Sequence, residues 1–380
     1  MVERDLTRRD TLRATAAAVA GGATAGCTSY SGTDDDPTGD DGSTATGEDT
    51  GPHSVTMEPV GTVEFDEPPE TWFPYTGDYA DMGVALGQAD GLEAIGIRRR
   101  FGSHHYDELP GVSVDKGELT QLWQDGTDRE LFYDIDADVH LIDPNFMINR
   151  IQWDRDDVDT VGSRVAPFVG NTVFSGSYGW HDYEQYTLYE AFEKVAQVFQ
   201  EQERYEAFAE LHDEVLSDVD SRLPDERPSV AVLFPKSVPP EAFYPYVIGS
   251  GTQSKHWRDL GVDRALAESD VADFHASRGT IDYETLLEVD PDVIAIRQQG
   301  EVTEAGFEAD FVSHMRNHDV ASELRAVRND DVVYGGMTYQ GPIINLFQTE
   351  RIAGSLYPDE FGGEQLFDRQ RVADIVTGEF

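Results

Sequence analysis

The chain has 380 residues, with 74 acidic and 28 basic side chains and a net charge of −46. Such a surface repels the phosphates of nucleic acids and of anionic membranes, so neither is an expected partner. Lysine occurs at only four positions, and acidic residues are spread through the whole chain. This pattern is typical of a protein that works in molar salt, where a Debye length of about 3 Å screens self-repulsion. An ordinary acidic protein is the alternative.

Residues 1–27 predict an export signal that is not part of the fold. Arg8 and Arg9 precede a run of small residues over 14–25, which resembles a Tat signal and is too short to span a bilayer. Ala25-Gly26-Cys27 resembles the site at which a lipoprotein signal peptidase cuts. Cys27, the chain's only cysteine, is therefore the predicted lipidation site, and a chance buried cysteine is the alternative.

Residues 28–57 predict a disordered acidic tether, because they are rich in Ser, Thr, Gly, Asp and Pro and poor in apolar residues. A folded body on a lipid-anchored tether would lie outside the cytoplasm, at the outer face of the cell membrane. This arrangement fits a receptor and also fits an anchored extracellular enzyme.

From residue 58 onward, strand-like and helix-like segments alternate, which predicts an α/β fold with mostly parallel sheets covered by helices. We expect an N-terminal lobe over 58–182, a linking helical segment over 183–223 and a C-terminal lobe over 228–380. The linking segment has no Gly or Pro until Pro224, and a break is expected near 200–203. Strands are expected at Val60–Phe65, Glu70–Pro74, Ala94–Ile97, Val139–Ile142, Val165–Val169, Thr172–Phe174, Val230–Phe234, Phe243–Ile248, Val293–Ile296 and Val332–Tyr334. The prediction is two lobes joined by a single long helix, with a ligand cleft between them.

Four segments in this order resemble the class III substrate-binding proteins of ABC importers, which serve siderophores, haem and cobalamin. They are Tyr79–Leu92 with its Ala-Leu-Gly exit, the glycine-rich turn Gly249–Thr252 with Trp257–Val262 behind it, Ile281–Ile294 and Leu324–Tyr334. The N-terminal lobe departs most from the family pattern, at Phe132–Val139. The resemblance implies a monomeric receptor that hands its ligand to a membrane permease through surface carboxylates such as Glu284 or Glu288. The ligand that the resemblance implies is an Fe(III)-siderophore as the first choice, followed by cobalamin or haem.

Ligands of open α/β sheets bind beyond the carboxyl ends of the strands, so the loops there supply the candidate ligand-binding residues. Aromatic rings in these loops can stack on a planar or chelated ligand, and arginines can bind its oxygens in a bidentate manner. Packing of the rings and pairing of the arginines with nearby acids are the alternatives. The candidates are Tyr75, Tyr79, His105, Tyr178, Trp180, Phe243, Tyr244, Thr252, Arg278, Arg297 and Tyr339.

Direct metal binding and catalysis are not expected from these residues. His104, His105, His181 and His275 invite a metal site, but adjacent side chains of a strand point to opposite faces, so transport of a chelated metal is favoured. No resident cofactor is expected. The alternative of an anchored extracellular enzyme, for example a hydrolase, is disfavoured because the sequence lacks a G-x-S-x-G nucleophile turn. The segment Gly176-Ser177-Tyr178-Gly179 falls short of this motif. A surface-layer or adhesion protein is a third alternative. It would show β-rich repeats, and none are visible in the sequence.

Overall fold

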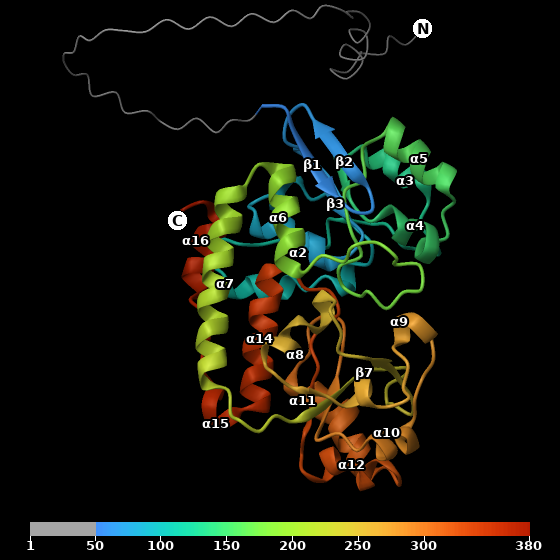
Figure 1. Cartoon of the computed structure of the whole chain (residues 1–380), viewed down its shortest axis with the longest axis vertical. Helices are drawn as coiled ribbons and strands as arrows, with labels where there is room; N and C mark the ends of the chain where they lie inside the picture. Colours follow the sequence, from blue (N-terminus) through green and yellow to red (C-terminus); the bar gives the residue numbers. More distant parts are fainter. Residues whose placement is uncertain (1–50) are drawn as a thin grey trace, which may run out of the picture. The chain divides into compact units, whose positions relative to one another are not determined.

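The computed structural model describes residues 51–380, which lie within one compact unit (Figure 1). The predicted signal, Cys27 and most of the predicted tether lie outside the described residues. The last part of the tether range is a strand, because β1 (His53–Met57) pairs antiparallel with β2 (Gly61–Phe65). Val55 and Met57 of this hairpin are buried in the hydrophobic core. This packing orders the segment, and the amino-acid composition alone does not reveal it.

The N-terminal lobe contains short parallel strand pairs in place of one long sheet. β3 (Trp72–Pro74) pairs with β6 (Val139–Leu141), and β4 (Ala94–Ile95) pairs with β5 (Thr120–Gln121). Single parallel bridges connect Trp72 to Leu92 and His140 to Phe168. The last of these bridges is all the pairing found in 165–174, so the two strands expected there do not form.

Helices cover these strands, and local sequence signals explain where several begin. The N-terminal lobe has α2 (Gly77–Ala85), α3 (Arg129–Ile135), α4 (Pro144–Ile151) and α5 (Arg155–Arg164). Asp143 caps α4 through a 2.8 Å bond from the Asn145 N–H, with Pro144 in the first turn. Asp154 forms a capping box with Asp157 at the start of α5.

Two helices form the linking segment. α6 (Leu188–Phe199) begins at a capping box from Thr187 and ends at Gln200, whose left-handed backbone closes the helix. α7 (Gln202–Arg222) has 21 residues and is about 30 Å long. The break expected near 200–203 lies at Gln200 and Glu201, whereas the first helix begins five residues later than the range 183–223.

The C-terminal lobe contains one five-stranded sheet in the order β11-β10-β7-β8, with β9 pairing β7. Its strands are β7 (Ser229–Pro235), β8 (Phe243–Tyr246), β9 (Asp263–Arg264), β10 (Val293–Ile296) and β11 (Val332–Tyr334). All pairings are parallel except β7 with β8. The helices are α8 (Lys255–Asp259), α9 (Phe274–Ser277), α10 (Tyr283–Val289), α11 (Glu304–Phe307), α12 (Ser313–Asn317) and α13 (Arg325–Arg328).

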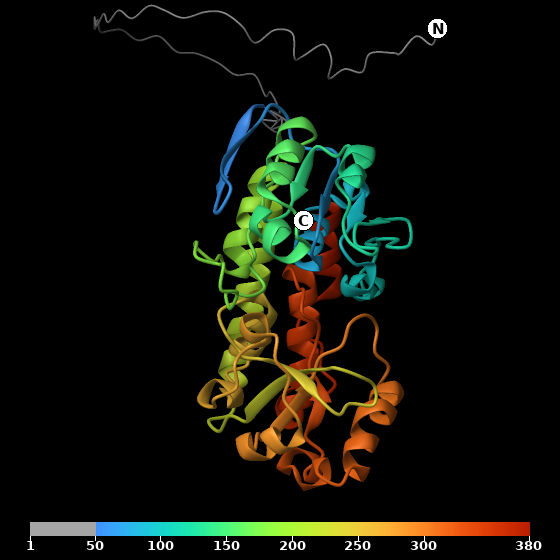
Figure 2. The same ribbon diagram turned by 90° about the vertical axis from the view of Figure 1, so that its right-hand side faces the viewer.

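The C-terminal helices return from the second lobe to the first. α14 (Pro342–Leu356) packs on α8 and on α2 and α6 of the first lobe, and α16 (Arg369–Thr377) packs on α2 and α7. Figures 1 and 2 show these red helices beside the yellow-green α7, with α15 (Pro358–Phe361) at the turn. The two lobes are therefore connected by α7 and also by packing of α14. Among the described residues, no helix is long and apolar enough to cross a membrane.

Candidate ligand-binding site

A cavity of about 280 Å³ lies between the two lobes. The N-terminal lobe contributes Tyr75, Ile97, Arg100, Trp123, Phe146, Arg150, Ile151 and Tyr178, and the C-terminal lobe contributes Tyr246, Phe274, His275, Arg278, Gln299, Thr338 and Tyr339. Several of these residues follow a strand: Tyr75 follows β3, Trp123 follows β5 and Tyr339 comes after β11. The cavity thus lies beyond the carboxyl ends of the strands, where ligands of open α/β sheets bind.

The lining of this cavity is cationic, although the chain as a whole is strongly acidic. Arg100, Arg150 and Arg278 line it, and no described lining residue is Asp or Glu. None of the three arginines forms an ion pair among residues 51–380, whereas surface arginines such as Arg316 pair with two carboxylates. A guanidinium without a carboxylate keeps its N–H donors available, and its charge attracts an anion into a site that is partly shielded from water.

Aromatic rings hold two of these guanidinium groups in place. The Cζ of Arg278 lies 5.3 Å from the centre of the Tyr178 ring and 4.7 Å from that of Phe274. The Cζ of Arg150 lies 5.9 Å from the same Tyr178 ring. Arg278 ends α9 in a left-handed conformation, with φ of 59°. Tyr178 of the first lobe therefore contacts a cation from each lobe through cation–π interactions.

The tyrosines of the cavity stay in the neutral phenol form at neutral pH. Burial raises the pKa of Tyr75 to about 12 and raises the pKa of Tyr339 as well. Phe174 packs edge-on against Tyr339, at 5.0 Å between ring centres, behind the cavity wall. The site therefore combines fixed positive charge with flat apolar rings, a surface that suits a bulky anion with aromatic or conjugated parts.

A family model described as periplasmic binding protein matches residues 141–338 of the chain. The chain belongs to the periplasmic binding protein family. The match spans the linking helices, the sheet of the C-terminal lobe and most of the cavity-lining residues, and it confirms the family resemblance stated from the sequence. Members of this family bind solutes outside the cytoplasm, so this periplasmic binding protein is a solute-binding protein.

Solved structures show the same fold at low sequence identity. A periplasmic binding protein from Veillonella parvula is 14% identical with a TM-score of 0.60, covering 81% of this chain and 98% of its own. An Fe3+-hydroxamate transport system protein from Saccharomonospora viridis is 20% identical with a TM-score of 0.55, covering 80% and 99%. The Helicobacter pylori protein CeuE, solved with Ni-His, is 14% identical with a TM-score of 0.56, covering 86% and 96%. No curated protein matches this periplasmic binding protein in sequence.

Four of the candidates from the sequence line the cavity: Tyr75, Tyr178, Arg278 and Tyr339. Trp180 stacks on Tyr178 with 4.8 Å between ring centres and so supports the lining without belonging to it. Tyr75 and Tyr339 lie in loops after a strand, Tyr178 and Trp180 lie in the 175–187 segment between the lobes, and Arg278 lies at the end of α9.

The structure places the remaining candidates away from this cavity, in packing or hydrogen-bonding positions. The Tyr79 hydroxyl donates to the Asn171 carbonyl (3.0 Å), and His105 is buried against the Phe347 ring. Phe243 is fully buried against Tyr283, and Tyr244 packs on Phe274. The Thr252 N–H donates to the Val173 carbonyl (3.0 Å), and Arg297 is fully buried beneath the Tyr246 ring.

Sequence reasoning missed Arg100 and Arg150, which are two of the three cations. Arg100 ends the run Arg98-Arg99-Arg100 directly after the predicted strand Ala94–Ile97, and such a run is unusual in a chain with 28 basic residues. Arg150 lies in the last turn of α4, where a cation also suits the helix dipole. Scarce cations close to a strand end were therefore a usable signal.

The spacing H-x-x-x-H, which predicts two ligands on one helix face, occurs at His314 and His318 and was also missed. Both imidazole Nε2 atoms approach Glu241, at 3.4 and 3.3 Å. However, the Nδ1 atom of His318 accepts the backbone N–H groups of Val320 and Ala321, so its hydrogen is on Nε2, which then cannot bind a metal. No group of metal-binding geometry occurs among residues 51–380.

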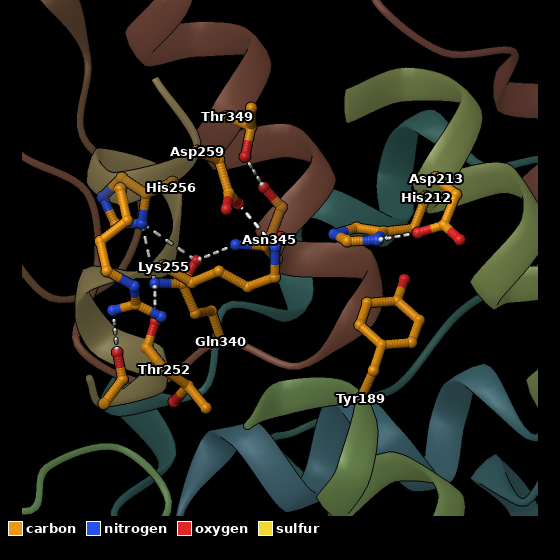
Figure 3. Close-up of polar contacts among 12 residues, drawn as sticks. Tyr189, His212, Asp213, Thr252, Lys255, His256, Asp259, Gln340, Asn345 and Thr349 are labelled. Carbon is orange, nitrogen blue, oxygen red and sulfur yellow. Dashed lines mark hydrogen bonds and ion pairs between the residues drawn. The ribbon is translucent and has the colours of Figure 1, made fainter. Parts of the chain in front are cut away.

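A buried polar network fixes the loop that carries Tyr339 (Figure 3). The side-chain amide of Gln340 donates to the Thr252 carbonyl (2.8 Å) and lies 2.8 Å from Nδ1 of His256, and it accepts from Asn345 (2.9 Å). Lys255 forms a 2.6 Å ion pair with Asp259 nearby on α8. Because the hydrogen bonds of Gln340 join its loop to Thr252 and to His256 of α8, the position of the neighbouring Tyr339 is set by other parts of the fold and not by the loop alone.

Proposed function

We propose that this periplasmic binding protein is the receptor of an ABC importer and that it binds an anionic metal chelate, an Fe(III)-siderophore as the first choice, which it delivers to a permease. The single observation that carries the proposal is the cavity with three arginines and no carboxylate lining residue. The fold shared with siderophore and haem receptors supports the ligand class. Binding without turnover is part of the proposal.

The charge of the cavity sharpens the choice of chelate. Tricatecholate and polycarboxylate complexes of Fe(III) carry net negative charge, whereas neutral trihydroxamate complexes do not. Three arginines favour the first group, because each charge-assisted hydrogen bond contributes about 1.5–3 kcal/mol. Haem brings two carboxylates on a flat ring and is the next choice. Cobalamin is the bulkiest of the three and suits a cavity of about 280 Å³ least.

Fluorescence titration tests this proposal directly, because Trp123 lines the cavity and Trp180 stacks on Tyr178. The probes are an Fe(III)–tricatecholate chelate, a ferric trihydroxamate, haemin and cyanocobalamin, each titrated in molar salt. We expect saturable quenching, strongest with the tricatecholate. Failure of all four probes to bind would overturn the proposed ligand class.

Matched arginine variants separate recognition from non-specific attraction. Arg278→Gln removes a cavity charge, whereas Arg328→Gln removes an exposed one from the same lobe. We expect the first to weaken binding of the tricatecholate about tenfold or more and the second to leave it unchanged. Equal effects of both would mean that overall charge, and not the cavity, attracts the chelate.

The membrane anchor is proposed on the sequence alone. A lipid on Cys27, a tether and export by the Tat route would hold the receptor at the outer face of the membrane beside its permease. Cys27→Ser is expected to release the protein from the membrane fraction into the medium.

The proposed adaptation to molar salt is checked by thermal unfolding, with Tm expected to rise steeply between 0.2 and 3 M KCl.

A further inference from the structure

His275 is the only imidazole among the described residues that line the cavity. It lies on α9 and is surrounded by rings: its centre is 4.9 Å from Tyr178, 5.2 Å from Tyr246 and 5.6 Å from Phe174. In a metal-chelate receptor, a cavity imidazole can act in two opposite ways. It can bind the metal through a lone pair, or it can donate an N–H to an oxygen of the chelator.

A fully buried arginine decides how the neighbouring glutamine is oriented. Arg297 stands directly after β10, and its Nη1 donates to Oε1 of Gln253 at 3.0 Å while Nη2 donates to the Gln253 carbonyl. A guanidinium can only donate hydrogen bonds. The side-chain oxygen of Gln253 must therefore face Arg297, because the reversed amide would place an NH₂ group against the guanidinium.

The side-chain NH₂ of Gln253 consequently faces Nδ1 of His275, at 3.5 Å. An N–H can be accepted only by a ring nitrogen that carries no hydrogen. Asp273 also lies near this nitrogen, with Oδ1 at 3.4 Å. Both carboxylate oxygens of Asp273 already accept backbone N–H groups, from His275 (2.8 Å) and Val247 (2.9 Å). Burial lowers the pKa of His275, so the ring is neutral at neutral pH and carries one hydrogen.

We infer that His275 carries its hydrogen on Nε2 and donates it to an anionic oxygen of the chelator, so that it selects the chelator and does not bind the metal. This inference rests on the proposed function. It makes His275 a fourth donor beside Arg100, Arg150 and Arg278, and it makes Gln253 and Arg297 positioning residues. The receptor would then bind chelates that present oxygens outward, and it would gain nothing from a metal with open coordination positions.

The ring tautomer is measured first, in the protein without ligand. Long-range ¹H–¹⁵N NMR spectra of ¹⁵N-histidine-labelled protein distinguish Nε2–H from Nδ1–H, and loss of one signal in His275→Gln assigns it. We expect the Nε2–H form. An Nδ1–H ring, held by Asp273 with its lone pair toward the cavity, would overturn the inference whatever the ligand is.

Binding variants then test the role of the donor. His275→Gln keeps an N–H donor, whereas His275→Phe keeps a ring without one. With the Fe(III)–tricatecholate chelate we expect the first variant to bind within about threefold of the wild type and the second about tenfold more weakly. His314→Gln on α12 is the control and should bind like the wild type.

The outcomes separate this inference from the proposed function. Equal losses in His275→Gln and His275→Phe, or an iron–imidazole signature in the electron paramagnetic resonance spectrum of the complex, would overturn the donor role while the receptor proposal stands. Absence of binding by any anionic chelate would overturn the receptor's ligand class and the donor role with it.

Discussion

The two lobes build the same cavity from different kinds of scaffold. The C-terminal lobe has one five-stranded sheet, whereas the N-terminal lobe has a five-residue hairpin and pairs of strands of two or three residues that single bridges connect. The first lobe nevertheless supplies two of the three cavity arginines. A continuous sheet is therefore not needed to place a ligand-binding side chain, provided that capped helices and buried side chains hold the loops.

The lobes also differ in their buried titratable groups. The N-terminal lobe buries the carboxyl groups of Asp78 and Asp81, whereas the buried groups of the C-terminal lobe include Arg297, Asp273 and His256. Burial raises the pKa of Asp78 to about 6 and that of Asp81 to about 7, whereas the pKa of Asp273 is lowered despite burial because it is hydrogen-bonded to His275 and Val247. We therefore expect the carboxyl groups of the first lobe to make its stability depend on pH in the neutral range, and the predictions below begin with this lobe.

The largest effect is expected at Asp81 of α2. Its carboxyl group accepts the Ile344 N–H at the start of α14 (2.9 Å) and lies 2.7 Å from the Tyr106 hydroxyl, and burial raises its pKa to about 7, well above the usual value of an aspartate. The folded state thus holds a proton that the unfolded state has lost. The free energy of unfolding should fall by about 3 kcal/mol from this group as pH rises from 4 to 7.

Asp81→Asn removes that proton and should flatten this part of the pH dependence. Urea unfolding in molar salt at pH 4.5 and 7.5 measures the difference from the wild type. Asp66→Asn, an exposed position of the same lobe, is the control. An unchanged slope in Asp81→Asn would show that the carboxylate is ionised in the folded protein across this range.

His140 should give an effect of opposite sign. Its ring is buried among Phe73, Phe132 and Phe168, at 4.7 to 5.0 Å between ring centres, and burial lowers its pKa to about 3. The folded ring stays neutral while the unfolded ring gains a proton below pH 6.5, so stability is lost as pH falls below that value. His140→Phe should stabilise the protein by about 3 kcal/mol at pH 4 relative to its effect at pH 7. Urea midpoints at both pH values provide the check, and equal shifts at the two would contradict it.

A smaller effect is expected where the lobes touch behind the cavity. Ser250 donates to the side chain of Gln185 (2.7 Å), and a Cβ on Gly251 would lie 2.1 Å from the Phe174 carbonyl oxygen. Gly251→Ala must push the two lobes apart and should cost about 2 kcal/mol. Chelate affinity should fall with it, as measured by the same fluorescence titration. Gly249→Ala, whose Cβ meets little, is the matched control.

The smallest effects concern helix starts, and they should be alike in the two lobes. Asp128 caps α3 through the Glu130 N–H (3.0 Å), and Asp282 caps α10 through the Thr285 N–H (2.9 Å). Replacing either residue by Ala should lower the free energy of unfolding by about 1 kcal/mol. Urea unfolding of the two variants measures this loss. A clearly larger decrease in the free energy of unfolding for Asp128→Ala than for Asp282→Ala would show that the N-terminal lobe depends more on its helix caps.

The sequence by itself determined the family, the α/β fold and four of the five strands of the second lobe, whereas β9 was not predicted. Val293–Ile296 was predicted to the residue because a buried parallel strand is a continuous apolar run. In the first lobe, the strands expected at Glu70–Pro74, Ala94–Ile97 and Val139–Ile142 correspond to the shorter strands β3, β4 and β6, whereas the strands expected over 165–174 do not form. Only tertiary structure decided which arginines face the cavity: Arg278, at the end of α9, lines it, whereas Arg297, directly after β10, is buried in the core and donates to Gln253. The direction of a side chain depends on contacts between residues far apart in the chain, and no local pattern contains them.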